Sequence, residues 1–253
     1  MKIRILSLLA LVILNSCASK KQILYMQDAL QQGNGAVNYE SANIQPNDIL
    51  KITVESLVPE AAIPYNKSTA IGNIPQNLQI LQLDGYLVSL ENTINFPVLG
   101  EISTANKTTK ELEIIIKEKL ISEGHLANPN VNVRLINAKV TILGEVNKPG
   151  TYSFTEQNIT LLQALGYAND LTINGKREDV LITREVDGIR KVSHIDLTSA
   201  AFMNSEYYFI KPNDVIVVNP NNPKVKSAGF IGNVGTILTI ASLALSVTIL
   251  LTR

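Results

Sequence analysis

Residues 94–102 read INFPVLGEI, and this stretch, together with similar short phrases elsewhere in the chain, decides the fold. Its first six residues are rich in β-branched and aromatic side chains and are predicted to form a β-strand. A similar phrase, ILGEV, recurs at residues 142–146, and IQPNDIL at residues 44–50 recurs as IKPNDVI at residues 210–216. Pro presets φ and Asn and Asp tolerate turn geometry, so each Pro-Asn-Asp copy predicts a turn that leads into a strand.

A helix is predicted shortly after residue 102. Thr108 and Glu111 have the spacing of a capping box, and Leu112, Ile116 and Leu120 follow at helical spacing. Further strands are predicted at residues 131–135, from residue 140, at 180–184 and at 189–192, with a short helix at 161–165 that stops at Gly166. The last two strands flank Asp187-Gly188, a hairpin signal. This order predicts an α+β fold divided near residue 137.

The composition excludes several classes of protein. Of the 253 residues, 45% are hydrophobic and 17% are charged, which is too apolar for a disordered chain. Lys plus Arg equals Asp plus Glu at 22 each, so no overall positive field points to nucleic acid as a partner.

The N-terminus has the pattern of a bacterial secretion leader, assigned to residues 1–16. Lys2 and Arg4 precede an apolar run over residues 5–14, which is too short to span a bilayer as a helix. The run ends in LNSC at residues 14–17, which resembles the lipobox of bacterial lipoprotein precursors.

Cys17 is therefore the predicted lipidation site. It is the single cysteine of the chain, so no internal disulfide is possible. A diacylglyceryl group and a further acyl chain such as palmitate give stable anchoring where one chain does not. The sequence ASKK at residues 18–21 places no Asp next to Cys17, which favours sorting to the outer membrane. An ordinary signal peptide with an incidental cysteine is the alternative.

Residues 228–252 carry no charged side chain and are predicted to form a transmembrane helix. At about 1.5 Å per residue the segment is roughly 37 Å long, enough to cross a hydrocarbon core of about 30 Å. On a helix its small and hydroxyl residues share one side, opposite Ala241 and Leu245. We call this side the polar seam, and it consists of Gly232, Gly235, Thr236, Thr239, Ser242 and Ser246.

The polar seam has two physical uses. It lets helices approach closely in lipid, or it faces water in a pore made by several copies. A simple anchor helix, which needs no polar seam, is the third alternative. Residues 220–227, which contain several Asn, Pro and Lys residues, read as a linker before this helix.

The mature chain resembles the Wza-type outer-membrane polysaccharide export lipoproteins. Residues 44–54 resemble the opening of the polysaccharide export domain, with Pro-Asn-Asp where the family usually has Pro-Gly-Asp. Residues 94–102 resemble the most recognisable stretch of that domain, and residues 108–120 its capped helix. The glycine often found just before residues 94–102 is absent, and Asn92 is expected to take its turn role because Asn tolerates positive φ.

From Val140 the chain resembles a soluble-ligand-binding β-grasp (SLBB) domain. GEVNKPGTY at residues 144–152 matches the entry to that domain, and TLLQAL at residues 160–165 matches its helix. Larger family members have two or more such domains, whereas this chain has room for one.

The resemblance implies a homo-oligomeric ring, octameric in the well-known form, whose C-terminal helices line an α-helical barrel with porin activity. It also implies an inner-membrane co-polymerase, often linked to a tyrosine kinase, as partner. The exported polysaccharide, capsular polysaccharide or exopolysaccharide, would pass along the axis.

An enzymatic function finds little support in the residues. His125 and His194 are the two histidines, and neither has metal-ligand spacing, so no metal and no cofactor is predicted. Glu101 and Glu145 form the carboxylate pair that a glycoside hydrolase would need, with solvated or turn-pairing acids as the alternative. The chain has no Trp, which argues against a tight carbohydrate site.

The predicted protein is a translocon subunit without catalytic residues. Its soluble domains lie in the periplasm, and its fold is α+β: an export domain followed by a β-grasp-like domain, with a C-terminal transmembrane helix. The predicted segments are the signal peptide 1–16, a tether 17–40, the export domain 41–137, the SLBB domain 138–219, the linker 220–227 and the helix 228–252. The rival functions are a monomeric ligand-binding lipoprotein and a cell-wall glycan hydrolase.

Overall fold

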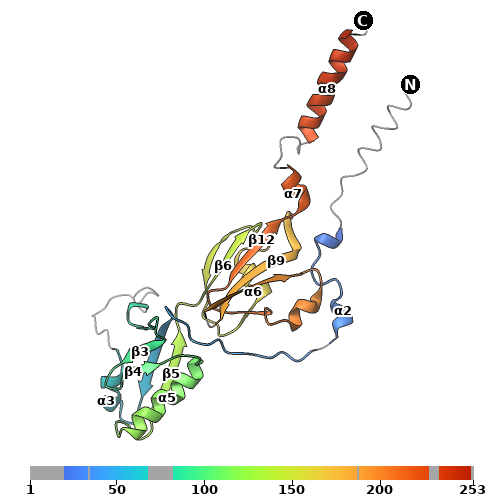
Figure 1. The fold of residues 1–253 in the computed structure, drawn as a ribbon. Helices are drawn as coiled ribbons and strands as arrows, with labels where there is room; N and C mark the ends of the chain where they lie inside the picture. The colour runs from blue at the N-terminus through green and yellow to red at the C-terminus, as the bar shows by residue number, and fades with distance from the viewer. Residues whose placement is uncertain (1–19, 34, 68–81, 187, 228–233, 252–253) are drawn as a thin grey trace.

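A computed structural model describes residues 20–33, 35–67, 82–186, 188–227 and 234–251. Two α/β domains follow one another along an elongated molecule, and helix α8 extends from the end opposite the first domain (Figure 1). Each domain has its own hydrophobic core, and Leu135 packs against both of them. The predicted mixture of helices and strands is therefore confirmed.

The first domain is built on a three-stranded antiparallel sheet. Its order is β2 (Tyr86–Leu87), β1 (Ile49–Glu55) and β5 (Asn130–Leu135). Alternate residues of β1 are buried, as expected for a strand with one face on a core. Ile52 pairs with Val133, and both side chains are almost fully buried. The short helices α3 (Pro59–Ala62) and η2 (Ile63–Tyr65) follow β1.

Helix α5 (Thr109–Ser122) covers this sheet. Leu112, Ile116 and Leu120 lie one turn apart, and all three are completely buried. The predicted capping box is confirmed: the Thr108 hydroxyl accepts from the Glu111 N–H, and the Glu111 carboxylate accepts from the Thr108 N–H at 2.8 Å. The cap satisfies two backbone donors that the first turn would otherwise leave unpaired.

The Thr108 cap supports a first prediction. Thr108→Ala is expected to lower the free energy of unfolding by about 0.5–2 kcal/mol, the usual effect of removing an N-cap. Urea denaturation followed by circular dichroism measures this change. Thr109→Ala, one residue into α5, is the matched control, and an equal loss in both variants would contradict the capping role.

The stretch at residues 94–102 differs from its prediction. A strand was expected over residues 94–99, but β3 (Thr93–Phe96) ends before Pro97 and β4 (Gly100–Ser103) returns antiparallel to it. Pro97 has no N–H to continue a ladder, and Val98 has a φ of 68°, which reverses the chain. The stretch is therefore a hairpin.

The second domain contains a five-stranded mixed sheet with the order β10-β9-β12-β6-β7. Its strands are β6 (Lys139–Gly144), β7 (Gly150–Ser153), β9 (Gly175–Val186), β10 (Ile189–Ile195) and β12 (Val215–Pro220). The β6–β12 pair is parallel and the other pairs are antiparallel. The predicted hairpin is confirmed by its strands, since β9 and β10 pair antiparallel with Val186 opposite Ile189; Asp187 lies outside the described residues.

Helix α6 (Leu161–Tyr167) packs on the core of this sheet and extends one residue beyond the predicted stop at Gly166. The short strands β8 (Ile159–Thr160) and β11 (Phe209–Ile210) pair beside it, and η3 (Ala200–Asn204) precedes β11.

The two Leu-Gly-Glu phrases share one backbone feature. Gly100 has a φ of 70° and Gly144 a φ of 89°, a region that favours glycine. At Gly144 a Cβ atom would also lie 2.1 Å from the Val218 carbonyl oxygen, because β6 approaches β12 closely there. Each Leu-Gly-Glu phrase thus places a glycine with positive φ at the end of a strand: Gly100 at the start of β4 and Gly144 at the end of β6.

The predicted linker over residues 220–227 is largely helical. Helix α7 (Asn222–Ser227) follows β12 directly. The Asn221 side chain accepts a hydrogen bond from the Lys224 N–H at 3.1 Å, and Pro223 stands in the first turn, where no intrahelical N–H bond is lost. The Asn-Pro cluster therefore starts a helix.

The prediction of a transmembrane helix over residues 228–252 is not upheld. Residues 228–233 and 252 lie outside the described part, and α8 (Val234–Leu251) has 18 residues. Among the residues that the structure describes, no helix has the combined length and apolarity needed to cross a membrane.

Candidate functional site

The two Pro-Asn-Asp phrases form the same turn twice. Asn47 and Asn213 have φ values of 69° and 68°, and the following residues, Asp48 and Asp214, are 3% and 1% exposed. Each carboxylate accepts a backbone N–H from three residues earlier, at 2.8 and 2.9 Å. The recurring turn chemistry that the sequence predicted is confirmed.

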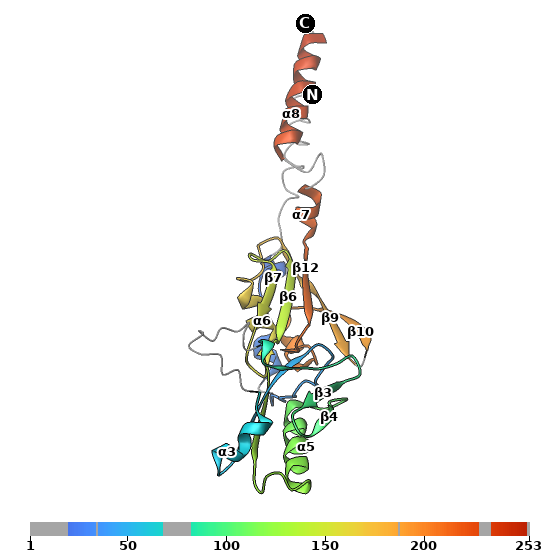
Figure 2. The same ribbon diagram turned by 90° about the vertical axis from the view of Figure 1, so that its left-hand side faces the viewer.

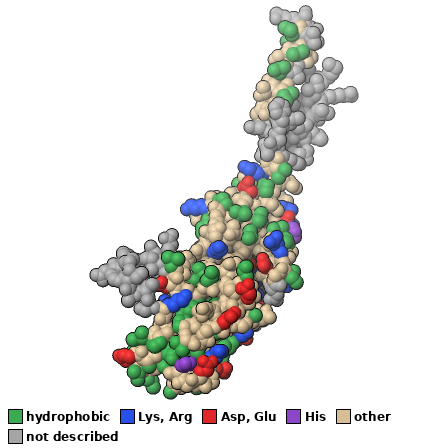
Figure 3. All heavy atoms as spheres, turned by 60° about the vertical axis from the view of Figure 1, so that its left-hand side comes forward, with side chains coloured by type: hydrophobic (Ala, Val, Ile, Leu, Met, Phe, Trp, Pro, Cys, Tyr) green, Lys and Arg blue, Asp and Glu red, His purple; other side chains and the backbone are tan. Residues whose placement is uncertain are grey.

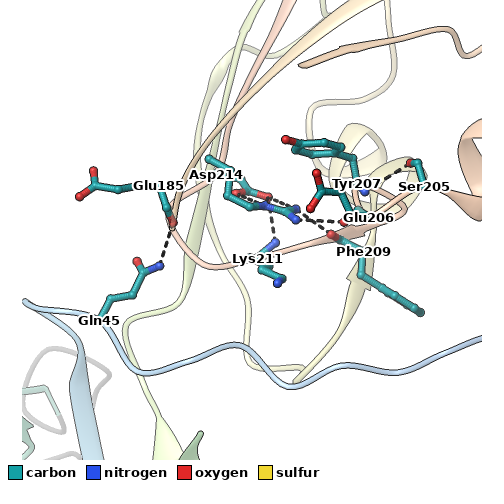
Figure 4. Close-up of polar contacts among 9 residues, drawn as sticks. Gln45, Glu185, Ser205, Glu206, Tyr207, Phe209, Lys211 and Asp214 are labelled. Carbon is teal, nitrogen blue, oxygen red and sulfur yellow. Dashed lines mark hydrogen bonds and ion pairs between the residues drawn. The ribbon is translucent and has the colours of Figure 1, made fainter. Parts of the chain in front are cut away.

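The second turn is tied to the sheet by a buried ion pair. Arg184, on β9, donates from Nε to Oδ1 of Asp214 at 2.9 Å and from Nη2 to Oδ2 at 2.7 Å. The same guanidinium donates to the carbonyl oxygens of Glu206 and Phe209, both at 2.9 Å, and lies 4.8 Å from the Tyr207 ring centroid. Figure 4 shows this cluster. Arg184 therefore holds the segment that leads into β12 against β9.

The first turn contains a buried acid without a cation. Among the described residues, no charged side chain forms an ion pair with Asp48. Burial raises the pKa of Asp48 to about 6, and the hydrogen bond from the Gln45 N–H offsets only part of that effect. The two turns therefore share geometry and differ in electrostatics.

The first turn also contacts the second domain. Gln45 donates from Nε2 to the Glu185 carbonyl oxygen at 3.1 Å, next to Arg184 (Figure 4). Asn137 donates to the Asn47 carbonyl oxygen at 2.9 Å and accepts from the Ile49 N–H at 2.8 Å. We call the contacts between the 44–49 turn, Asn137 and the β9 end the domain junction.

An N-terminal clamp, residues 25–28, fixes the start of the described chain to the second domain. The Tyr25 hydroxyl donates to Asp170 at 2.5 Å, and its ring lies over Arg177 at 5.1 Å. Asp28 accepts from the Ser199 hydroxyl at 2.7 Å. The backbone of the clamp also bonds to the chain at residues 197 and 198. The predicted tether is thus packed on the domain from Tyr25 onward.

A cavity of about 460 Å³ lies where the chain passes from this clamp to the first domain. One wall comes from residues between Gln32 and Ala42 and includes Gly35 and Val37, and the other comes from residues between Met203 and Pro212, with Gln157 and Asn158 beside them. The Tyr39 ring packs on the Phe209 ring at 5.2 Å between centroids. The cavity is large enough for a small ligand.

The predicted site residues fall into two groups. Cys17 and Gly232 lie outside the described residues. The rest of the polar seam, Gly235, Thr236, Thr239, Ser242 and Ser246, lies on α8. Figure 3 shows apolar side chains at several places on the visible surface of α8 and no charged side chain there.

The seam hydroxyls bond within their own helix. Thr239 donates to the Gly235 carbonyl oxygen at 2.8 Å, Ser242 to that of Thr239 at 2.9 Å and Ser246 to that of Ser242 at 2.9 Å. These donors therefore need neither water nor a partner side chain. The seam is made of small residues, and the hydroxyl protons of Thr239, Ser242 and Ser246 are satisfied within the helix.

The acids of the hydrolase alternative lie in different domains. Glu101 is exposed on β4 of the first domain, and Glu145 follows β6 of the second. Glu145 accepts from the Thr172 hydroxyl at 2.8 Å, as a turn-pairing acid does. His194 binds Asp179 at 2.5 Å, and His125 lies 3.4 Å from Glu123. Within the described ranges no group of His, Cys, Asp and Glu side chains is arranged to hold a metal ion.

Sequence reasoning missed Arg184 and the clamp. Val180 and Ile182 point into the core, and the period-two pattern of a strand puts Arg184 on the same inward face. A cation at an inward position needs a buried acid, so the pattern was a usable signal for the Asp214 pair. Tyr25 and Asp28 carried no local pattern.

Comparison with known proteins matches both domains. Residues 36–136 match the family described as "Polysaccharide biosynthesis/export protein", and residues 138–218 match the SLBB domain family. The predicted resemblance to Wza-type export proteins is therefore confirmed, and the chain carries an export domain followed by an SLBB domain. The first family is one of export proteins, not of enzymes.

Similar individual proteins carry names of the same kind. The chain is 32% identical over 106 residues to "EPS I polysaccharide export outer membrane protein EpsA" of Ralstonia nicotianae, a match that spans 40% of the chain and 27% of the relative. It is 28% identical over 149 residues to EpsA of Ralstonia solanacearum, spanning 56% of the chain and 38% of the relative. It is 27% identical over 210 residues to "Capsule polysaccharide export outer membrane protein CtrA" of Neisseria meningitidis, spanning 81% of the chain and 51% of the relative.

The matches thus cover between about a quarter and a half of each relative's length. All three relatives are named as outer-membrane proteins, which supports the predicted outer-membrane location.

Proposed function

We propose that the chain is an outer-membrane lipoprotein subunit of a ring-shaped translocon that exports capsular polysaccharide or exopolysaccharide. The lipid at Cys17 anchors each subunit. The two domains form the periplasmic wall of the ring, and polymer passes along its axis toward the cell surface. An inner-membrane co-polymerase, with or without a tyrosine kinase, delivers the polymer.

The two ends of the described chain support this arrangement. Helix η1 (Lys20–Gln22) and helix α7 lie at the same end of the second domain, and the first domain lies at the opposite end (Figure 1). The N-terminal clamp holds the chain there, a few residues after Cys17. A lipid at Cys17 would therefore bring the α8 end to the membrane and direct the first domain toward the periplasm.

The polar seam is proposed to be the surface along which α8 helices of neighbouring subunits pack. Leu243 and Leu250 of α8 are 64% and 79% exposed, so much of its apolar surface is not covered by the part of the chain that the structure describes. Small residues let helix backbones approach closely, and the hydroxyls of Thr239, Ser242 and Ser246 bring no unpaired donor into such a contact.

Two leucine substitutions test the seam. Ser242→Leu adds bulk on the seam and is expected to shift the detergent-extracted protein from oligomer to smaller species. Ala241→Leu adds bulk to the neighbouring residue on the opposite side of α8 and is expected to leave the oligomer intact. Size-exclusion chromatography with light scattering measures both, and equal behaviour of the two variants would contradict packing along the seam.

The observation that carries the proposed function is the succession of the export domain and the SLBB domain along one chain. Deleting the gene from its host is expected to abolish surface polysaccharide and to leave polymer inside the envelope. The full chain should restore export, and Cys17→Ala should fail to do so while the protein is still made. Unchanged surface polysaccharide after deletion would contradict the proposal.

The cavity beside residues 32–42 favours a second candidate, a monomeric ligand-binding lipoprotein. That function predicts a single chain per particle and export that continues without the protein. The same deletion strain distinguishes the two.

A further inference from the structure

The second-domain sheet has two edge strands on opposite sides. β10 lies at one edge and β7 at the other, and within the described part of the chain each pairs with one strand only (Figure 2). An edge strand presents unpaired backbone N–H and C=O groups and is usually covered or protected. These two edges are therefore candidate surfaces for another strand.

β10 is exposed on both of its faces. Its first four residues are all exposed, and Ile189 and Val192 are 65% and 55% exposed. Successive side chains of a strand point to opposite faces, so a run of four exposed residues means that neither face of β10 packs on the core there. The apolar side chains and the free edge together mark an uncovered pairing surface.

The strand directions determine how two copies can meet. β6, β12 and β10 run in one direction, and β7 and β9 run in the other. The strands lie roughly along the long axis of the molecule (Figures 1 and 2). Rotation about a ring axis parallel to them keeps each direction, so β10 of one copy meets β7 of the next in antiparallel orientation, the more stable pairing.

Charges at the two edges are complementary in this orientation. β10 starts at the domain junction, where Arg190 and Lys191 are exposed. β7 ends at the same level of the molecule, since Ser153 pairs with Lys139 at the start of β6, and the exposed Glu156 follows it. The basic start of β10 would thus face the acidic segment after β7 of the neighbouring copy.

We propose that the partner of the β10 edge is the β7 edge of a second copy of this chain, so that the sheets of neighbouring subunits continue into one another. This inference rests on the proposed function, because it requires that the chain forms an oligomer. It adds the surface through which neighbouring subunits contact one another. The contact is head-to-tail, because each copy offers β10 on one side and β7 on the other, and such contacts form a ring when the rotation between neighbours closes.

Disulfide crosslinking of the full-length protein in membranes tests the pairing. Ser153→Cys is combined in turn with cysteine at Arg190, Lys191, Val192 and Ser193. At least one double variant should form a ladder of covalent oligomers, with crosslinking at alternate positions along β10, whereas the parent chain and Ser153→Cys alone should not. Covalent dimers from Val192→Cys alone would show β10 meeting β10 and would overturn the head-to-tail contact.

A charge exchange provides a second measurement. Glu156→Lys and Arg190→Glu are each expected to reduce the oligomeric fraction, and the two together should restore it. Ring particles that persist without crosslinks and without a response to either charge change would overturn the β10–β7 contact and leave the export function standing. A chain that is monomeric in detergent and in membranes would overturn both.

Discussion

Asp214→Asn is expected to destabilise the second domain by about 3–5 kcal/mol, because it leaves the Arg184 guanidinium buried without its acid. The side chains of Arg184 and Asp214 are 3% and 1% exposed, so solvent cannot take over the lost interaction. Denaturant titration measures the loss, and hydrogen exchange of β9 and β12 locates it in the sheet that the pair holds together.

The matched control removes both charges. Arg184→Met combined with Asp214→Leu is expected to cost much less than Asp214→Asn alone, since a buried pair replaced by apolar residues leaves no charge unpaired. Arg190→Ala on the exposed β10 should change stability by less than about 0.5 kcal/mol. A loss below about 1 kcal/mol for Asp214→Asn would contradict the structural role of the pair.

Asp48→Asn is expected to stabilise the protein, although Asp48 occupies in the first Pro-Asn-Asp turn the position that Asp214 occupies in the second. Burial raises the pKa of Asp48 from 3.8 to about 6. One pKa unit corresponds to about 1.4 kcal/mol, so the buried carboxylate costs up to about 3 kcal/mol at neutral pH. Asn accepts the same Gln45 N–H bond without a charge, and the variant should gain about 1–3 kcal/mol at pH 7.

The pH dependence has a definite sign. Well below 3.8, the pKa in the unfolded chain, the Asp48 carboxyl is protonated in both the folded and the unfolded chain, so variant and parent should be equally stable. Between the unfolded value and about 6 the unfolded chain ionises first, and the parent loses stability as the pH rises. The difference should be constant above that range. Glu101→Gln, on the exposed β4, is the control, and a gain for Asp48→Asn that is the same at pH 4 and pH 7 would contradict this account.

Local signals in the sequence predicted the local structure well. The Thr108 cap, the β9–β10 hairpin and both Pro-Asn-Asp turns lie where their residue types indicate. Asn92 has a φ of 57°, so it takes the turn position that the resemblance assigned to it. Each of these features depends on residues within four positions of one another.

The features that the sequence did not predict depend either on residues far apart in the chain or on an unusual backbone conformation at one residue. Arg184 and Asp214 are 30 positions apart, and Gln45 reaches Glu185 across 140 positions. No pattern within a short window relates such residues. The hairpin at residues 94–102 was missed because Val98 adopts a positive φ that β-branched residues rarely take.

The uncharged composition of residues 228–252 was not sufficient to predict the structure of α8. The uncharged run over residues 228–252 predicted a membrane-spanning helix, whereas no helix among the described residues has the length and apolarity to cross a membrane. The seam hydroxyls of Thr239, Ser242 and Ser246 bond within α8, and packing of neighbouring helices along the seam stays a prediction.

We propose that several copies of this chain form a ring through which polysaccharide leaves the cell. Electron microscopy of the full-length protein, extracted in mild detergent from its own membrane, tests this proposal most directly. We expect ring-shaped particles with rotational symmetry and an axial opening, each built from several copies. Particles that contain a single chain, without symmetry, would contradict it.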